Sequence, residues 1–221
     1  MKKVQDHYFK KAKKQGFPAR SVYKLEEAQK KHRFLKPGQI VLDLGAYPGS
    51  WSKYTAGVAG PKGMVVAVDI QKPNVMADNI CLLQKDVYDL KLLKLREISP
   101  YFDVVLSDMA PKTTGRKDVD HFRSVALAER ALFLAKELLK PGGTFFCKVF
   151  QGEDFPSFRD KCRESFRSVR VVKPKSSRPE SVELFLLCTE HENLPPARYA
   201  RSTYTDEHRQ KTLSTGEHTS E

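Results

Sequence analysis

The sequence lacks the features that mark membrane-bound, secreted and zinc-ribbon proteins. Its longest apolar run is only a handful of residues, far short of the ~20 that a helix needs to cross a bilayer. No apolar segment with a small-residue cleavage site follows the start, so we expect no secretory signal. No CxxC pair occurs, which predicts no metal site, and three of the four cysteines lie in apolar runs. Buried reduced thiols of this kind are typical of a cytoplasmic protein.

Acidic residues are scarce at the start of the chain. Residues 1–36 hold ten lysines and two arginines but only three acids, so their net charge of +9 is three quarters of the protein's +12. Such a block attracts polyanions because binding releases counterions. Aromatic rings on which bases can stack lie among the cations, at Tyr8, Phe9, Phe17 and Tyr23. They favour RNA as the partner over the alternative of a solvated lysine-rich leader.

The length and composition suffice for one ordinary domain. A chain of 221 residues that is 40% hydrophobic can build a packed core. We divide it into a basic leader and N-terminal helix over 1–36, a core domain over 37–189 and a polar tail over 190–221. The leader's helix is predicted over 20–34, because apolar residues there follow the helical period and Pro37-Gly38 ends the pattern.

Apolar strands alternate with helices through the core domain. Strands are predicted at 40–44, 64–69, 80–83, 102–107, 144–150, 169–172 and 182–188, and helices near 52–59, 119–139 and 155–166. Continuously apolar strands indicate a mostly parallel sheet that helices cover on both faces. Only a short loop joins the last two strands, so we expect them to pair antiparallel. The predicted fold class is therefore α/β, with a seven-stranded, Rossmann-like sheet.

The first strand ends in a turn of small residues, at the sheet edge where such folds hold ligands. In Asp43–Trp51, Gly45 and Gly49 let the backbone approach a ligand closely. The turn is not the dinucleotide fingerprint GxGxxG, because its third glycine is missing and Pro48 has no N–H to donate to a pyrophosphate. This excludes a nicotinamide cofactor.

Carboxylates follow the next two strands. Asp69 is placed to bind ribose hydroxyls, and Asp86 to bind an adenine amino group. Either residue alone could be a turn former or a helix cap. Together with the small-residue turn and no phosphate clamp, they predict S-adenosylmethionine as the cofactor.

The fourth strand ends in Ser107–Pro111, without the Asn/Asp-Pro-Pro-aromatic sequence of amino-methylating enzymes. No nucleophilic cysteine of a cytosine-C5 enzyme lies nearby, so an oxygen acceptor is favoured. Lys148 and Glu183 are charges inside apolar strands that should be neighbours, which is expensive unless they are paired or functional. With Asp108 they could form one buried polar cluster; the alternative for Lys148 is a snorkelling lysine at the sheet end.

Five segments together resemble the FtsJ/RrmJ (RlmE) ribose 2′-O-methyltransferases, over about residues 8–189. They are Arg20–Leu25, Asp43–Trp51, Ser107–Pro111, Lys148–Gly152 and Ser177–Glu183. The resemblance implies a class I methyltransferase that uses S-adenosylmethionine to methylate a uridine ribose in the A-loop of 23S ribosomal RNA. It also implies that the assembled large ribosomal subunit is the preferred partner. We expect a monomer with no metal and no membrane contact.

The resemblance further implies the site residues. Lys148 is the expected proton acceptor, in a tetrad with Lys24, Asp108 and Glu183. The family's cofactor positions fall on Gly49, Trp51, Asp69, Asp86 and Asp108, and we assign Asp43, Gly45, Pro48, Ile70 and Val87 to the same site. Four residues depart from the usual pattern, namely Tyr47, Ser50, Lys112 and Phe185. Tyr47 and Ser50 could crowd the methionine end of the cofactor.

Two alternative functions stay open at this point. One is the same chemistry on a transfer RNA ribose, as in close relatives of the family. The other is a noncatalytic RNA-binding or ribosome-assembly module on a methyltransferase fold. An intact tetrad argues against the second alternative, since a pseudo-enzyme has no reason to keep charged residues in core strands.

Overall fold

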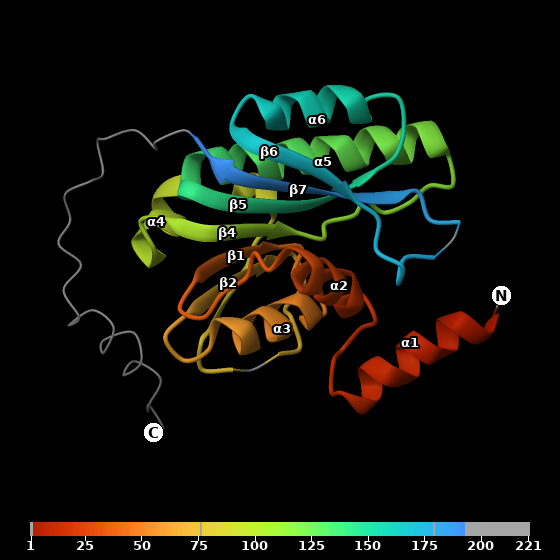
Figure 1. The fold of residues 1–221 in the computed structure, drawn as a ribbon, viewed down its shortest axis with the longest axis horizontal. Helices are drawn as coiled ribbons and strands as arrows, with labels where there is room; N and C mark the ends of the chain where they lie inside the picture. Colours follow the sequence, from red (N-terminus) through yellow and green to blue (C-terminus); the bar gives the residue numbers. More distant parts are fainter. Residues whose placement is uncertain (1, 76, 179, 193–221) are drawn as a thin grey trace, which may run out of the picture.

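The computed structural model describes residues 2–75, 77–178 and 180–192 (Figure 1). The predicted polar tail, 190–221, lies outside the described residues from residue 193 onward. The division of the chain into leader, core domain and tail stays a prediction.

A single mixed sheet of seven strands forms the centre of the described chain, in the order β3-β2-β1-β4-β5-β7-β6. The strands β1 to β5 pair in parallel, whereas β7 runs antiparallel to both of its neighbours, β5 and β6. This confirms the predicted topology. The strands are β1 (Ile40–Leu44), β2 (Met64–Asp69), β3 (Ile80–Gln84), β4 (Phe102–Ser107), β5 (Leu139–Phe150), β6 (Phe166–Val172) and β7 (Glu183–His191).

Helices cover both faces of the sheet, as Figure 1 shows. Side chains of α4, α5 and α6 form a core with one face, and those of α2 and α3 form a core with the other. The predicted fold class is thus confirmed. The helices are α1 (Lys2–Lys14), α2 (Val22–His32), α3 (Ser50–Ala59), α4 (Leu92–Ile98), α5 (Lys117–Leu138) and α6 (Phe155–Arg163), with a short 3-10 helix, η1 (Val87–Asp89).

The burial pattern of strand β5 shows how the two cores are separated and to which face Lys148 points. Cys147 and Val149 belong to the core under α5 and α6, whereas Phe146 belongs to the core under α2. Successive side chains of a strand point to opposite faces. Lys148 therefore shares the face of Phe146, on the side of the sheet that α2 covers.

Several elements differ from the sequence prediction. The strand β5 begins at Leu139, five residues before the predicted start at 144, so Pro141-Gly142-Gly143 lies within it. A register shift between Phe102 and Val104 on the neighbouring strand accommodates these residues. The helices α4 and η1 were not predicted, and α6 ends at Arg163 because β6 already begins at Phe166. The last strand, β7, continues to His191.

Part of the basic leader is the helix α1, which the sequence did not predict. Tyr8 and Ala12 pack with Val22 and Tyr23 of α2 in a small third core. The ammonium group of Lys11 lies 4.6 Å from the centre of the Tyr23 ring, a cation–π contact. The apolar side of α1 is thus held on α2.

Candidate active site

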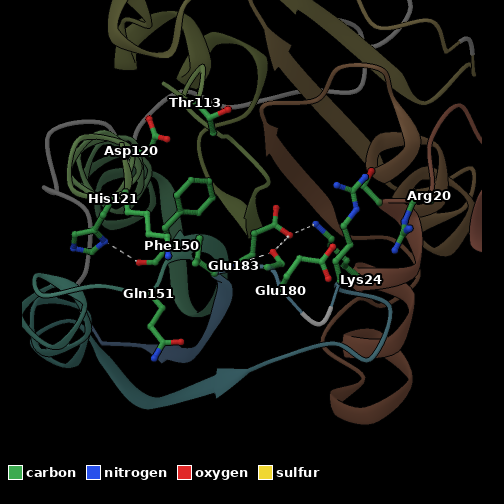
Figure 2. A pocket seen from close by; sticks show the side chains of 14 residues that line it. Arg20, Lys24, Thr113, Asp120, His121, Phe150, Gln151, Glu180 and Glu183 are labelled. Carbon is green, nitrogen blue, oxygen red and sulfur yellow. Dashed lines mark hydrogen bonds and ion pairs between the residues drawn. The ribbon is translucent and has the colours of Figure 1, made fainter. Parts of the chain in front are cut away.

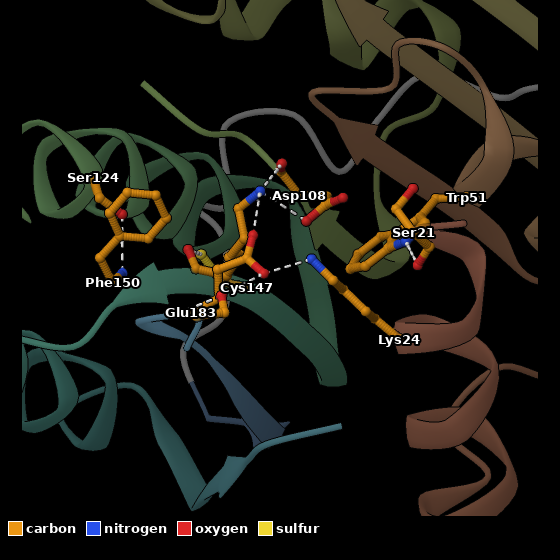
Figure 3. A network of polar contacts seen from close by, with 10 residues as sticks. Ser21, Lys24, Trp51, Asp108, Ser124, Cys147, Phe150 and Glu183 are labelled. Atoms are coloured by element: carbon orange, nitrogen blue, oxygen red, sulfur yellow. Dashed lines mark hydrogen bonds and ion pairs between the residues drawn. The ribbon is translucent and has the colours of Figure 1, made fainter. Parts of the chain in front are cut away.

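Four charged side chains from distant parts of the chain meet at the carboxyl end of the sheet (Figure 3). Lys148 Nζ, from β5, lies 2.9 Å from Asp108 Oδ1 and donates a 2.6 Å hydrogen bond to the Asp108 carbonyl oxygen. It lies 3.8 Å from Glu183 Oε1 of β7. Lys24 Nζ, from α2, completes the chain of contacts at 2.6 Å from Glu183 Oε2. The structure therefore brings the four residues of the predicted tetrad together, while their catalytic roles stay predictions.

Lys148 is buried and the other three members of the tetrad are half-buried, with lysines and carboxyl groups alternating along the chain of contacts. The Lys148 side chain is 5% exposed and that of Asp108 15%. Burial by itself would raise the pKa of Glu183, but the charges of Lys24 and Lys148 and the hydrogen bonds from Lys24 and Ser181 lower it below its usual value. Glu183 is therefore ionised at neutral pH, and its carboxylate lies between the two lysines. Pairing of this kind offsets much of the cost of burying the charges.

A cavity of about 500 Å³ opens beside the tetrad (Figure 2). Lys24 and Glu183 line it on one side, and α5 and the end of β5 line the other. Its walls also carry cations from three different elements, Arg20, Lys117 and Arg178. The cavity lies between α2 and α5, and its lining contains no residue of the small-residue turn after β1. We call it the acceptor cavity.

The rim of the acceptor cavity is made by the loop between β6 and β7, which is tied to α2. The carboxylate of Glu27 accepts hydrogen bonds from the backbone N–H groups of Lys175, at 2.7 Å, and Ser176, at 3.1 Å. Arg20 Nη2 donates to the Ser176 carbonyl oxygen at 2.7 Å. These contacts join segments about 150 residues apart in the sequence and hold the loop against the N-terminal helices.

Asp69, the predicted cofactor residue at the end of β2, has hydrogen-bond acceptor sites left for a nucleoside. Each carboxylate oxygen of Asp69 accepts one backbone hydrogen bond, from Tyr47 N at 2.9 Å and from Gln71 N at 2.8 Å. A carboxylate has about four acceptor sites, so two remain for ribose hydroxyls. The next side chain, Ile70, is 56% exposed and offers an apolar surface to a base. The residues present fit the predicted nucleoside.

Asp43 is completely buried at the end of β1. Its Oδ2 accepts a 2.6 Å hydrogen bond from the Ser52 hydroxyl, whereas Oδ1 has no hydrogen-bond partner among the described residues. Burial raises the pKa of Asp43 to about 7, against the lowering effect of the Ser52 bond and with the help of the nearby charges of Asp108 and Asp69. A buried carboxylate oxygen without a partner fits a ligand that carries an ammonium group.

Asp86 and Val87 lie at the end of β3, as predicted. Asp86 is exposed and caps η1, with its Oδ1 accepting a 2.9 Å hydrogen bond from the N–H of Tyr88. Its Oδ2 has no recorded hydrogen bond among the described residues and could accept one from an adenine amino group. Val87 is buried.

The two glycines of the turn after β1 are required by the packing of the protein itself. Gly45 has φ +78° and Gly49 has φ +112°, conformations that favour glycine. A Cβ atom on Gly45 would lie 2.7 Å from the side chain of Met109, and one on Gly49 would lie 2.5 Å from Val75. Pro48 follows a cis peptide bond. The predicted close approach of a ligand to this turn is untested.

The side chain of Trp51 lies inside the protein, and its predicted contact with the cofactor stays a prediction. Its indole is buried and donates from Nε1 to the Ser21 carbonyl oxygen at 2.9 Å. The ring stacks on Phe146 and makes a tilted contact with Phe185. The side chain therefore fixes α2, the helix that carries Lys24, to α3 and the sheet. Any contact of Trp51 with the predicted cofactor would use its backbone.

Among the residues that depart from the family pattern, Ser50 and Phe185 have clear structural roles. The Ser50 hydroxyl is buried and accepts a 2.6 Å hydrogen bond from Ala19 N, which joins α3 to the segment before α2. Phe185 stacks on Phe146 at 5.1 Å inside the core. Tyr47 is 43% exposed, and nothing in the structure explains Lys112.

The helix α5 contributes to the acceptor cavity, which was not predicted from the sequence. Lys117, Asp120 and His121 from its first turns line the wall opposite Lys24. Asp120 is not free to bind a ligand, because its carboxylate holds the Thr114 and Gly115 backbone and its pKa is lowered mainly by the bond from the Thr114 N–H. No periodicity in the sequence distinguished these residues from an ordinary exposed first turn.

Two kinds of feature are absent from the described residues, a metal site and a membrane-spanning helix. No group of three or more His, Cys, Asp and Glu side chains is arranged to hold a metal ion. None of the helices in the described ranges is both long and apolar enough to span a bilayer.

Known proteins match this chain over nearly all of its described length. A family model described as FtsJ-like methyltransferase matches residues 17–191. The ribosomal RNA large subunit methyltransferase E of Bdellovibrio bacteriovorus is 49% identical over 186 residues, which cover 83% of this chain and 95% of that protein. The protein of the same name from Brachyspira hyodysenteriae is 46% identical over 194 residues, covering 88% and 100%.

A solved structure matches as well. The crystal structure of a protein described as a ribosomal RNA methyltransferase from Plasmodium falciparum superimposes with a TM-score of 0.72 at 27% identity. The superposition covers 80% of this chain and 100% of that one. The matched residues 17–191 include all four members of the tetrad and the cavity beside it.

Proposed function

This chain belongs to the FtsJ-like methyltransferase family, and from that premise we propose that it methylates a ribose 2′-hydroxyl in large-subunit ribosomal RNA, with S-adenosylmethionine as the methyl donor. The resemblance found in the sequence is thereby confirmed at the level of the family. Relatives that are 46–49% identical over most of their length and bear the name ribosomal RNA large subunit methyltransferase E support the substrate class. The observation that carries the proposal is the chain of contacts Lys24–Glu183–Lys148–Asp108 beside a cavity.

We assign Lys148 as the residue that contacts the acceptor hydroxyl. When bound, the cofactor supplies an electrophilic sulfonium methyl group. The Asp108 carbonyl and carboxylate hold Lys148 Nζ at 2.6 and 2.9 Å, so the amine has a fixed position at the carboxyl end of β4. In its free-amine form, it orients the ribose hydroxyl and receives the proton that the oxygen loses as the C–O bond forms. Positioning of this kind can contribute about 7 kcal/mol or more to lowering a reaction barrier.

The other three members of the tetrad set the position and charge of Lys148. Glu183 lies between the two lysines, 2.6 Å from Lys24 and 3.8 Å from Lys148. It thus separates two like charges that would otherwise repel each other. Ser181 donates a 3.0 Å hydrogen bond to the same Glu183 oxygen that Lys24 contacts, which fixes the carboxylate. We assign Lys24 and Glu183 to orientation, and Asp108 to both orientation and the cofactor.

We assign the cofactor residues from the carboxyl oxygens at the strand ends that can still accept hydrogen bonds. Asp69 has two acceptor sites left for ribose hydroxyls, and Asp86 has an oxygen for the adenine amino group. The Asp43 oxygen without a partner is suited to the ammonium group of the methionine part. Ile70 and Val87 supply apolar contacts, and Gly45, Pro48, Gly49 and Trp51 contribute backbone.

The basic leader is the part of the chain that we assign to RNA docking. Lys10, Lys13 and Lys14 are exposed on α1, while Tyr8 and Ala12 on the same helix pack against α2. A helix held by its apolar side presents its cations to a phosphate backbone.

We propose that the substrate is a uridine of 23S ribosomal RNA in the assembled large subunit. The ribose enters through the acceptor cavity. The protein acts as a cytoplasmic monomer.

The experiment is a comparison of 2′-O-methylation in ribosomal and transfer RNA from cells with and without this protein. One uridine of the large-subunit RNA should lose its methyl group when the protein is absent, and purified protein with S-adenosylmethionine should restore it. A lost methyl group on transfer RNA would identify the first alternative function. Unchanged methylation of every RNA would identify the noncatalytic module.

A further inference from the structure

The loop that follows β5 is held by one histidine of α5. His121 is buried at the acceptor cavity and lies against residues 150–154, which come directly after Lys148 (Figure 2). Its Nδ1 lies 3.1 Å from the Phe150 carbonyl oxygen. Its Nε2 accepts a 3.0 Å hydrogen bond from the backbone N–H of Asp154. One side chain therefore contacts both ends of this five-residue loop.

The two contacts define the state of the imidazole. Because Nε2 accepts from a backbone N–H, it carries no proton, and Nδ1 must carry the proton that is donated to the Phe150 carbonyl oxygen. The ring thus bridges a backbone donor and a backbone acceptor. The Asp154 carboxylate lies near the same nitrogen, with Oδ2 at 3.4 Å.

The loop is shaped around the ring of His121. A Cβ atom on Gly152 would lie 2.5 Å from both Cγ and Nδ1 of the imidazole, a distance that real Cβ atoms do not show. Gly152 has no positive φ, so contact with the histidine, and not backbone conformation, requires glycine at this position. The ring and the loop therefore fit closely between the two hydrogen bonds.

A second residue of α5 fixes the same end of β5. The Phe150 N–H donates a 3.0 Å hydrogen bond to the Ser124 hydroxyl (Figure 3), while the Phe150 carbonyl oxygen receives the bond from His121. Both polar backbone groups of Phe150 are thus bound to one helix. Phe150 is two residues from Lys148 in the same strand, so the two side chains share one face of the sheet.

We propose that His121 is a positioning residue for methyl transfer: it fixes the end of β5, and with it the place of Lys148 and the wall of the acceptor cavity. The proposal rests on the proposed function, because Lys148 must be the group that meets the acceptor hydroxyl. His121 itself takes no proton from the substrate. It acts through the backbone of Phe150 and Asp154.

Three substitutions separate the two contacts. His121→Leu removes both, His121→Asn keeps an N–H near the position of Nδ1 for the Phe150 carbonyl, and His121→Gln keeps an acceptor near the position of Nε2 for Asp154. Gly152→Ala displaces the ring without changing it and should reproduce the effect of His121→Leu. Phe122→Ala, which removes the neighbouring side chain of α5 that is 67% exposed, is the matched control.

The first measurement is single-turnover methyl transfer with saturating cofactor and large subunits. We expect His121→Leu and Gly152→Ala to lower the rate about tenfold or more, the scale of small misplacements of a reacting group. His121→Asn should recover most of this loss, and Phe122→Ala should behave as the wild type. The affinity for S-adenosylmethionine should not change in any variant. A wild-type rate in His121→Leu, with only a lower melting temperature, would show that the histidine is merely structural.

The second measurement does not depend on the substrate. Hydrogen exchange of the Asp154 amide should be faster in His121→Leu and His121→Asn than in the wild type, and should stay slow in His121→Gln. Unchanged exchange in all three variants would overturn the proposed clamp. If the wild-type protein shows no methyl transfer to ribosomal RNA, the proposed function has failed, and the exchange result still decides whether His121 holds the loop.

Discussion

The acceptor side and the cofactor side of the candidate site are built in opposite ways. On the acceptor side, Lys24, Asp108, Lys148 and Glu183 compensate one another within 4 Å, and the contacts join segments far apart in the sequence. On the cofactor side, Asp43, Asp69 and Asp86 follow successive strands and form no ion pair among the described residues. The charged groups of the acceptor side are paired within the protein, whereas the carboxyl groups of the cofactor side have hydrogen-bond acceptors left for a ligand.

This difference indicates what each side is for. A compensated cluster keeps its geometry whether or not a substrate is present, which suits groups that must position a reacting atom. Uncompensated carboxylates with spare lone pairs suit recognition of hydroxyl, amino and ammonium groups. Substitutions on the two sides should therefore affect different measured quantities, the rate on one side and the cofactor affinity on the other.

The largest effect is expected at the centre of the acceptor side. Lys148→Met keeps the apolar stem and removes the ammonium group, so methyl transfer should fall about 10²-fold or more, the usual scale for a positioned acid–base group. Single-turnover rates with saturating cofactor and subunits provide the measurement. A wild-type rate would mean that Lys148 is only a snorkelling lysine.

The members of the tetrad should not act independently. Glu183→Ala and Lys24→Ala should each slow transfer less than Lys148→Met, since both residues act through Lys148. The double variant Lys148→Met/Glu183→Ala should be little slower than Lys148→Met alone. Additive losses would contradict the single cluster.

On the cofactor side the effect should appear in affinity. Asp69→Ala and Asp86→Ala each remove an acceptor for nucleoside donors, so the free energy of S-adenosylmethionine binding should weaken by about 1–3 kcal/mol. Calorimetric titration measures it, and Asp78→Ala, an exposed acid near β3, is the control. Unchanged affinity in both variants would contradict the nucleoside placement.

Substitutions in the leader should weaken RNA binding and leave the affinity for S-adenosylmethionine unchanged. Replacing Lys10, Lys11, Lys13 and Lys14 by glutamine should weaken binding of large subunits about tenfold and reduce the salt dependence by about one unit of slope per lost phosphate contact. Binding measured across a series of salt concentrations tests this. An unaltered slope would identify α1 as a solvated helix without a docking role.

The smallest expected effect concerns stability and pH. Asp43 has a folded-state pKa of about 7, above the ordinary aspartate value of 3.8, so the wild-type protein loses stability as pH rises from about 4 to 7. Asp43→Asn stays neutral and should become more stable than the wild type across this window, by about 1 kcal/mol or more above pH 7. Melting temperatures at pH 5 and pH 8 measure the change. A difference that does not vary with pH would contradict the raised pKa.

Much of the fold followed from local patterns in the sequence. Runs such as Ile40–Leu44 and Met64–Asp69 are strands with the predicted bounds, because continuous apolar residues between turn signals leave few alternatives. The strand ends then located Asp69, Asp86 and Asp108 by the rule that ligands lie at the carboxyl edge. The pairing of Lys148 with Glu183 followed because both charges are costly in apolar strands.

Other features depend on contacts between distant residues and had no local signal. The helix α1 was missed because its lysine-rich sequence has little apolar surface, and Tyr8 and Ala12 gain a partner only when α2 is present. The start of β5 at Leu139 depends on a register shift beside Phe102, not on its own Pro-Gly-Gly sequence. His121 was missed because its role lies in the backbone of a loop about 30 residues away.

The ties between α2 and the loop before β7 have a consequence for the order in which the site is made during synthesis. All of the proposed cofactor residues lie within the first 108 residues. The acceptor cavity, in contrast, needs contacts between the N-terminal segment and the end of the core domain. These contacts pair Glu27 with Lys175 and Ser176, Arg20 with Ser176, and Lys24 with Glu183. Domains form from the N-terminus as the ribosome elongates the chain. A nascent chain that has emerged only as far as β6 therefore holds every group for the cofactor and has an incomplete wall for RNA. The chain cannot engage a ribose until nearly all of its described length has left the ribosome that makes it.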